Sequence, residues 1–195
     1  LCRRKAALTQ IESEVEAQFT RLEKAVVRVD HVDSHRHVHM IPAVFRIVSD
    51  AAKRRGCTAI RISHEPLPKW NVLCHMSLAA SVFSNLPKKV VLSAFARTNR
   101  RIAKSLIAAD QVAGVLGSGR MDAAAFRAAV AIAPEGLTEI ITHPGISETI
   151  ELPVATKAEH AFLQSVNRRI ELSTLIDPTI AELLRACGIR LLRFS

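Results

Sequence analysis

The chain has 195 residues, of which 49% are hydrophobic and 23% charged, and its net charge is +9. This composition supports a packed core in one domain of ordinary size and excludes a disordered chain. No window holds about 18 consecutive apolar residues, so the sequence predicts no transmembrane helix.

Apolar periodicity and turn signals predict helices that alternate with short strands. Helices are expected over residues 8–26, 42–56, 86–110, 121–133 and 155–187, the last broken at Asp177-Pro178. Strands are expected over residues 27–32, 58–63, 111–116, 137–143 and 189–194. Residues 63–86 are expected to be irregular. Such alternation is typical of βαβ units with a parallel sheet, and therefore of an α/β fold.

Polar side chains gather after the first predicted strand, in the stretch HVDSHRHVHM. It holds four of the eight histidines and an aspartate: His31, Asp33, His35, His37 and His39. Histidine is the commonest metal ligand, but residues along one straight strand are too far apart to bind one ion together. We therefore expect the chain to leave the strand near Ser34. One histidine would then bind metal, the others would bind substrate, orient neighbours or face solvent, and Asp33 would accept a ring N–H.

A second polar cluster, THPG at residues 142–145, also follows a predicted strand. Parallel α/β folds build their sites at the carboxyl ends of strands, so His35 and His143 are expected at the same edge, with side chains within about 10 Å. Arg61, on the strand between them, should approach the same place. The alternative is two polar loops without metal. The remaining histidines, His31, His64, His75 and His160, are expected to have structural roles.

Several motifs resemble one known family. V-D-S-H-R-H-V-H-M-I-P-A-V-F resembles the D-S-H-x-H-x-H-x-x-P signature of the YdjC-like (ChbG) carbohydrate deacetylases, and I-T-H-P-G resembles that family's His-Pro signature. G-S-G-R-M-D-A and R-A-C-G-I-R-L are most similar to the hopanoid-biosynthesis-associated branch, HpnK. The resemblance covers nearly the whole chain.

The resemblance implies a metal-dependent deacetylase on a deformed TIM-like barrel of parallel strands and helices. It places His35 at a metal-ligand position and His143 at the position of a catalytic histidine that assists acyl transfer. Asp33 is implied as a second catalytic residue. Arg61, His37 and His39 are implied as substrate-binding residues. The cofactor is expected to be a divalent metal ion, Mg²⁺ as first choice and Zn²⁺ as second.

The chain also departs from the family pattern. The family opens with a strand that carries an Asp-Asp-Phe-Gly motif and continues with a second metal histidine, and neither is present here. A complete barrel of this kind takes about 250 residues. We therefore expect residues 1–195 to be a single domain, the C-terminal portion of a longer deacetylase barrel without its N-terminal units, and inactive by itself.

The expected reaction is metal-assisted hydrolysis of the acetamide of an N-acetylated sugar or glycolipid, with an N-acetylglucosaminyl hopanoid as one candidate. The protein is expected in the cytoplasm. A basic helix at residues 86–110 leaves peripheral contact with an anionic membrane open, and a homo-oligomer is also left open.

Two alternatives remain. One is a basic, non-catalytic module that binds nucleic acid or anionic lipid, although the chain has no Tyr, one Trp and no RNP, zinc-finger or P-loop pattern. The other is a different metal hydrolase, such as a phosphoesterase.

Overall fold

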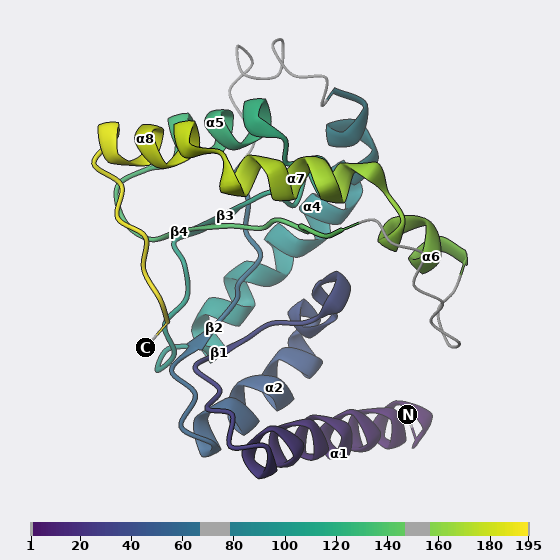
Figure 1. Cartoon of the computed structure of the whole chain (residues 1–195). Helices are drawn as coiled ribbons and strands as arrows, with labels where there is room; N and C mark the ends of the chain where they lie inside the picture. Colours follow the sequence, from purple (N-terminus) through teal and green to yellow (C-terminus); the bar gives the residue numbers. More distant parts are fainter. Residues whose placement is uncertain (1, 67–78, 147–156, 195) are drawn as a thin grey trace. The chain divides into compact units, whose positions relative to one another are not determined.

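The computed structural model describes residues 2–66, 79–146 and 157–194 (Figure 1). The chain divides into two compact units. Unit 1 comprises Leu1–His64, Val90–Asp110 and Leu192–Ser195, and unit 2 comprises Glu65–Lys89 and Gln111–Leu191. Within the described ranges, no helix is both long enough and apolar enough to cross a membrane.

Unit 1 is built from helices around a short parallel sheet. Its elements are α1 (Cys2–Lys24), β1 (His31–Val32), the 3₁₀ turn η1 (His35–Met40), α2 (Pro42–Arg54), β2 (Ala59–Ile60) and the part of α4 (Ala79–Ile102) that starts at Val90. In the parallel pairing of β1 with β2, His31 faces Ala59 and Val32 faces Ile60. Ile107 extends the pairing, since its N–H donates to the Thr58 carbonyl at 2.8 Å and its carbonyl accepts from Ile60 N–H at 2.9 Å.

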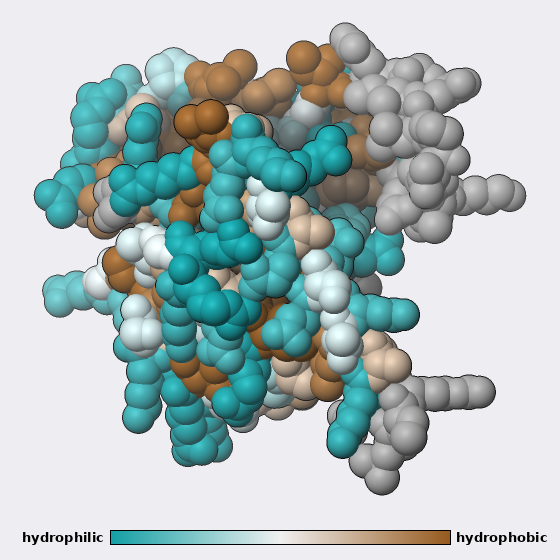
Figure 2. All heavy atoms as spheres, turned by 90° about the horizontal axis from the view of Figure 1, so that it is seen from below, coloured by the Kyte–Doolittle hydropathy of each residue, from teal (hydrophilic) through white to brown (hydrophobic). Residues whose placement is uncertain are grey.

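The helices of unit 1 follow from local signals in the sequence. Pro42 occupies the first turn of α2, where a missing N–H costs nothing, and Gly56 just beyond its end has φ +70°. α1 buries Phe19, which packs against Ala51 and Ala52 of α2 and against Cys57. Most other side chains of α1 are exposed, and Figure 2, viewed from the side of α1, shows mainly hydrophilic residues on this surface.

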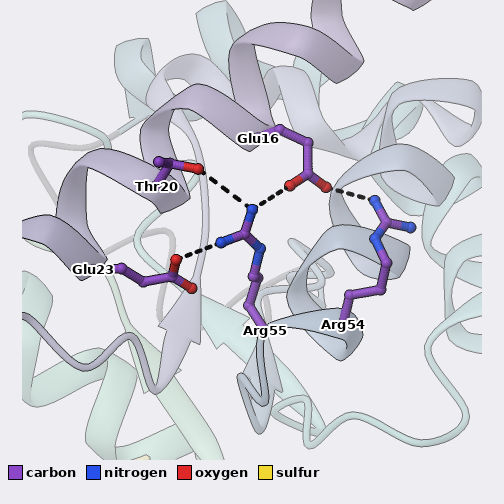
Figure 3. A network of polar contacts seen from close by, with 5 residues as sticks. All are labelled: Glu16, Thr20, Glu23, Arg54 and Arg55. Carbon is purple, nitrogen blue, oxygen red and sulfur yellow. Dashed lines mark hydrogen bonds and ion pairs between the residues drawn. The ribbon is translucent and has the colours of Figure 1, made fainter.

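An ion-pair network joins α1 to the end of α2 (Figure 3). Arg55 donates to Glu16 at 2.7 Å, to Thr20 at 3.4 Å and to Glu23. Arg54 donates to the other carboxylate oxygen of Glu16 at 2.6 Å. The three α1 side chains are four and three residues apart, so they lie on one helix face and point toward the two arginines.

Unit 2 contains the second parallel pair and most of the remaining helices. Its elements are the start of α4, β3 (Gln111–Ala113), α5 (Ala123–Ile132), β4 (Thr138–Ile140), α6 (Lys157–Leu163), α7 (Val166–Ile176) and α8 (Pro178–Ala186). β3 pairs with β4 in parallel, with Val112 facing Glu139. The side chains of Asp122 and Asp177 accept backbone N–H groups at the starts of α5 and α8, at 2.9 and 2.8 Å, as good N-caps do.

The predicted order of helices and parallel strands is confirmed for β1 to β4 and the helices that follow them, and so is the helix break at Asp177-Pro178. The strands are much shorter than predicted, with two or three residues each. Within the described residues they form two separate two-stranded sheets. The single sheet was therefore wrong, and the TIM-like barrel stays a prediction.

Two further predictions were wrong. The helix predicted over residues 86–110 is α4, which begins at Ala79, carries Pro87 in its interior and ends at Ile102. Residues 79–86, predicted to be irregular, are therefore helical, and residues 67–78 lie outside the described part. Residues 189–194, which the structure describes, form no strand. Ile189 N–H instead donates to the Leu184 carbonyl at 2.8 Å, closing the end of α8 at Gly188, whose φ is +66°.

Candidate functional site

The histidine cluster of unit 1 lies on a tight turn. β1 ends at Val32, Ser34 is extended, and η1 begins at His35, which confirms that the chain leaves the strand near Ser34. Arg36 and His37 have φ values of 53° and 57°, in the left-handed region. Residues other than glycine pay of order 1–3 kcal/mol each there, and such residues concentrate at functional sites. The three histidines of the turn differ in burial: His35 is exposed, His37 is half-buried and His39 is buried.

His39 is a buried structural histidine. It is 1% exposed, and its Nε2 lies 2.9 Å from the Arg61 carbonyl oxygen. Because a carbonyl only accepts, Nε2 carries the proton and Nδ1 accepts from the Ser34 hydroxyl at 2.7 Å. The same hydroxyl oxygen accepts the His39 backbone N–H at 2.9 Å. Burial lowers the pKa of His39, with the bond to the Arg61 carbonyl opposing this, so the ring is held neutral.

These contacts use both ring nitrogens of His39 to join the turn to the segment that follows β2. They give no support to the predicted contact between His39 and substrate. His37 is half-buried, and its Nδ1 lies 2.7 Å from the hydroxyl of the buried Ser63. Both histidines thus contact residues just beyond the end of β2.

Asp33 and His35 are the accessible predicted site residues of this segment. His35 is exposed, as a ligand or substrate contact requires. Asp33 forms an ion pair with Arg61. The contact seen for Asp33 is therefore with a guanidinium, and the predicted contact with a histidine ring stays a prediction. Arg61 thus contacts the first cluster, and its predicted approach to an edge shared with His143 stays a prediction.

A single exposed imidazole fits one ligand position of a divalent ion. About three protein ligands are the usual minimum for a catalytic metal. Within residues 2–66, 79–146 and 157–194, no group of three His, Cys, Asp or Glu side chains is arranged to hold a metal ion. The described residues therefore do not build a complete metal site.

His143 lies in unit 2, three residues beyond the end of β4, and is half-buried. Its ring meets Phe162 of α6 edge to face, with centroids 5.4 Å apart. Its backbone N–H donates to a carboxylate oxygen of Glu171, and its carbonyl accepts from Arg168 Nε at 3.3 Å. His35 and His143 belong to different units, so their predicted proximity stays a prediction.

Glu65 supports the neighbouring strand end in unit 2. One of its carboxylate oxygens accepts Gly114 N–H at 2.9 Å, and the other accepts Leu116 N–H at 2.6 Å. Burial raises the pKa of Glu65, and the N–H donors oppose the rise. Gly114 has φ +97°, and a Cβ there would lie 2.4 Å from the Ile141 carbonyl oxygen, so the close approach of β3 to the residue after β4 requires glycine.

Sequence reasoning did not identify Glu65, Phe162, Arg168 or Glu171. The one available signal was the spacing of Arg168 and Glu171, which places both on the same helix face. Nothing in the sequence shows that this face is turned inward.

Comparisons with known proteins agree with the motifs. The family model described as YdjC-like protein matches residues 1–186. A carbohydrate deacetylase of Mus musculus is 27% identical over 192 residues, covering 95% of this chain and 61% of that protein. The carbohydrate deacetylase of Homo sapiens is 27% identical over 194 residues, covering 94% of this chain and 58% of that protein.

A chitooligosaccharide deacetylase of Enterobacter sp. (strain 638) is 42% identical over 59 residues, covering 30% of this chain and 23% of that protein. No solved structure matches the chain significantly. The chain thus spans less than two thirds of the length of these relatives. With the family model matched over residues 1–186, the chain belongs to the YdjC-like protein family.

Proposed function

We propose that the whole protein is a carbohydrate deacetylase that hydrolyses the acetamide of an N-acetylated amino sugar. The observation that carries the proposal is His143, a half-buried histidine three residues beyond a parallel strand, whose backbone is bonded to α7, in a chain of the YdjC-like family. The relatives named as deacetylases of carbohydrates and chitooligosaccharides support the same reaction class.

In this reaction a water oxygen adds to the acetamide carbonyl carbon, and the carbon–nitrogen bond then breaks. The carbonyl oxygen gains negative charge as the water adds, and the departing amine must receive a proton. An imidazole can perform either task, by stabilising the oxyanion as a donor or by protonating the nitrogen. We assign one of these tasks to His143. The products are acetate and a free amino sugar.

We also propose that a divalent metal ion takes part, Mg²⁺ before Zn²⁺, with His35 as one of its ligands. The support is the exposure of His35 on a turn that is otherwise tied down through His37 and His39. Asp33, which forms an ion pair with Arg61, is proposed as a second catalytic residue of the same site. His37 and Arg61 keep their proposed contacts with substrate.

The finer substrate proposal is an N-acetylglucosaminyl lipid of the hopanoid type. It rests on the motifs similar to the HpnK branch. In that case the exposed basic and apolar side chains of α4, such as Val90, Val91 and Arg101, would face an anionic membrane surface. A cytoplasmic location and a homo-oligomer belong to the same proposal.

The proposal is tested by acetate release from N-acetylglucosamine oligomers and from an N-acetylglucosaminyl lipid, using the whole protein with Mg²⁺ or Zn²⁺. His143→Gln should lower turnover by roughly 10²–10⁴-fold while metal content stays at the wild-type level. His35→Ala should lose metal and turnover together. His160→Gln on α6 is the matched control and should change neither.

Three results would count against the proposal. Acetate release from none of these substrates would remove the deacetylase function. A His143→Gln variant with wild-type turnover would remove the assignment of His143. Loss of metal in that variant would show that His143 is a ligand and that the two roles are exchanged.

A further inference from the structure

Unit 2 contains a buried carboxylate to which the proposed reaction gives no role. Glu171 of α7 is 0% exposed. A buried carboxylate is costly unless hydrogen bonds satisfy it. One oxygen accepts Met121 N–H at 3.1 Å, and the other accepts His143 N–H. Met121 follows β3 and His143 follows β4, so one side chain holds the segments that leave two neighbouring parallel strands.

Arg168, one turn earlier on α7, holds the same segment through its carbonyl groups. Its Nε donates to the His143 carbonyl at 3.3 Å, and its Nη2 donates to the Pro144 carbonyl at 3.2 Å. The Arg168 carbonyl in turn accepts Gly145 N–H at 3.1 Å. The backbone of residues 143–145 is therefore bound to α7 at both its N–H and its carbonyl groups.

The contact leaves no room for a larger residue at Gly145. A Cβ at Gly145 would lie 2.6 Å from Arg168 Cζ, so an alanine there would displace the guanidinium. The guanidinium also lies over the Phe162 ring, 5.6 Å from its centroid, and Phe162 is the ring that His143 meets edge to face. The same arginine thus contacts both the backbone of His143 and the aromatic partner of its imidazole.

We propose that Glu171 and Arg168 are positioning residues that set the backbone and ring orientation of His143. The inference rests on the proposed function only in taking His143 to act on substrate. Glu171 orients the N–H side of residue 143, Arg168 orients the carbonyl side, and Phe162 supports the ring. A shift of about 1 Å in a catalytic group is enough to cost on the order of 10²-fold in rate.

The first test is Glu171→Gln, which preserves size but not acceptor capacity. The carboxylate accepts from two backbone N–H groups, whereas the glutamine amide has one acceptor oxygen and an NH₂ group that donates. One of the two N–H groups therefore loses its acceptor. The matched control is Glu182→Gln, the same change at an exposed glutamate of α8.

The direct readout is the NMR signal of the His143 imidazole C–H, assigned by its absence in His143→Gln. We expect this signal to move in Glu171→Gln and in Arg168→Lys, which keeps the charge but loses the planar fork. It should stay in place in Glu182→Gln. A Glu171→Gln spectrum with the His143 signal at its wild-type position would overturn the inference.

The kinetic readout uses the whole protein and separates the two proposals. Glu171→Gln should lower kcat by on the order of 10²-fold with KM close to the wild-type value, as expected when alignment is lost and substrate binding is kept. A loss confined to KM would overturn the positioning role. A moved His143 signal combined with full activity of His143→Gln would remove the proposed function and leave the positioning contacts standing.

Gly145→Ala provides a second route that leaves Glu171 in place, in case Glu171→Gln does not fold. Alanine at Gly145 should displace the guanidinium, move the His143 signal and lower kcat. In an Arg168→Ala background the clash is gone, so the added Gly145→Ala change should have no further effect on the signal or kcat. Simply additive effects of the two substitutions would contradict the inference.

Discussion

The polar residues of the two motifs have different environments although they look alike in sequence. His39 is buried, and its ring nitrogens are hydrogen-bonded to the Ser34 hydroxyl and the Arg61 carbonyl, whereas His35 is exposed. His143 lies between these extremes, with its backbone bound to α7 and its ring against Phe162. A histidine with both nitrogens satisfied inside the fold stabilises the turn, and one with an accessible ring remains available for chemistry.

His39 predicts a pH dependence of stability. Burial lowers the pKa of His39 below 6.5, so below that pH the unfolded state binds more protons than the folded state. The free energy of unfolding should therefore fall as the pH drops from about 7.5 through 6.5 toward the lowered pKa. Urea unfolding at a series of pH values measures this slope.

His39→Gln should remove part of that slope and lower stability by about 1–3 kcal/mol at neutral pH, because the Ser34 hydroxyl or the Arg61 carbonyl loses its partner. His160→Gln is the control for loss of a histidine and should retain the wild-type slope. An unchanged slope in His39→Gln would show that another group produces the pH dependence.

At the scale of elements, short strands depend on side-chain contacts beyond the backbone ladder. β1 and β2 have two residues each, so their pairing alone supplies few hydrogen bonds. The helices and turns around them add contacts. His39 bonds the Arg61 carbonyl, and Arg54 and Arg55 at the end of α2 bond Glu16 of α1. α1 buries few residues, so it depends on these polar contacts more than a core helix does.

The arginine–glutamate network predicts how α1 responds to acid and salt. Arg54 first and Arg55 second lower the pKa of Glu16, so the stabilisation is present above about pH 4.5 and is lost as the pH falls through the lowered pKa. Arg55→Ala should lower the melting temperature and speed hydrogen exchange of α1 amides at neutral pH.

The difference in melting temperature and in hydrogen exchange between Arg55→Ala and wild type should shrink in acid and in about 1 M salt. Acid protonates the glutamates of these exposed ion pairs, and salt screens the charges. Arg21→Ala, an exposed arginine of α1, is the control and should leave the exchange of α1 amides unchanged. Equal effects of the two substitutions would mean that the network does not hold α1.

At the scale of the whole molecule, the candidate residues are divided between two units. Asp33, His35 and Arg61 belong to unit 1, and His143 belongs to unit 2. The chain spans 61% of the Mus musculus relative and 58% of the human one. The residues to which the proposed function gives roles are thus found in both units.

The lack of a three-ligand metal group among the described residues predicts how the 195-residue chain behaves by itself. We expect it to release acetate from N-acetylglucosamine oligomers at no more than the background rate with added Mg²⁺ or Zn²⁺, because the described residues hold no group of three metal ligands. Acetate release and bound metal are measured side by side with the whole protein. Turnover equal to that of the whole protein would show that these residues complete the site.

The sequence by itself determined the family, the two motifs, and the order of the helices and of four of the five predicted strands. Those features depend on local signals: apolar spacing, Pro42 and Gly56 around α2, the Asp177-Pro178 start of α8, and short runs of characteristic residues. The sequence also indicated that the turn begins near Ser34, since one strand cannot present so many ligands to one ion.

Only the tertiary structure decided which side chains are buried and what they contact. That His39 is enclosed while His35 is exposed depends on the left-handed backbone at Arg36 and His37 and on the Arg61 carbonyl, 22 residues along the chain. That Glu171 accepts His143 N–H depends on where α7 packs, 28 residues from the histidine. Long-range contacts of this kind leave no periodic signal in the sequence, because they arise when separate elements pack and bring a donor to an acceptor.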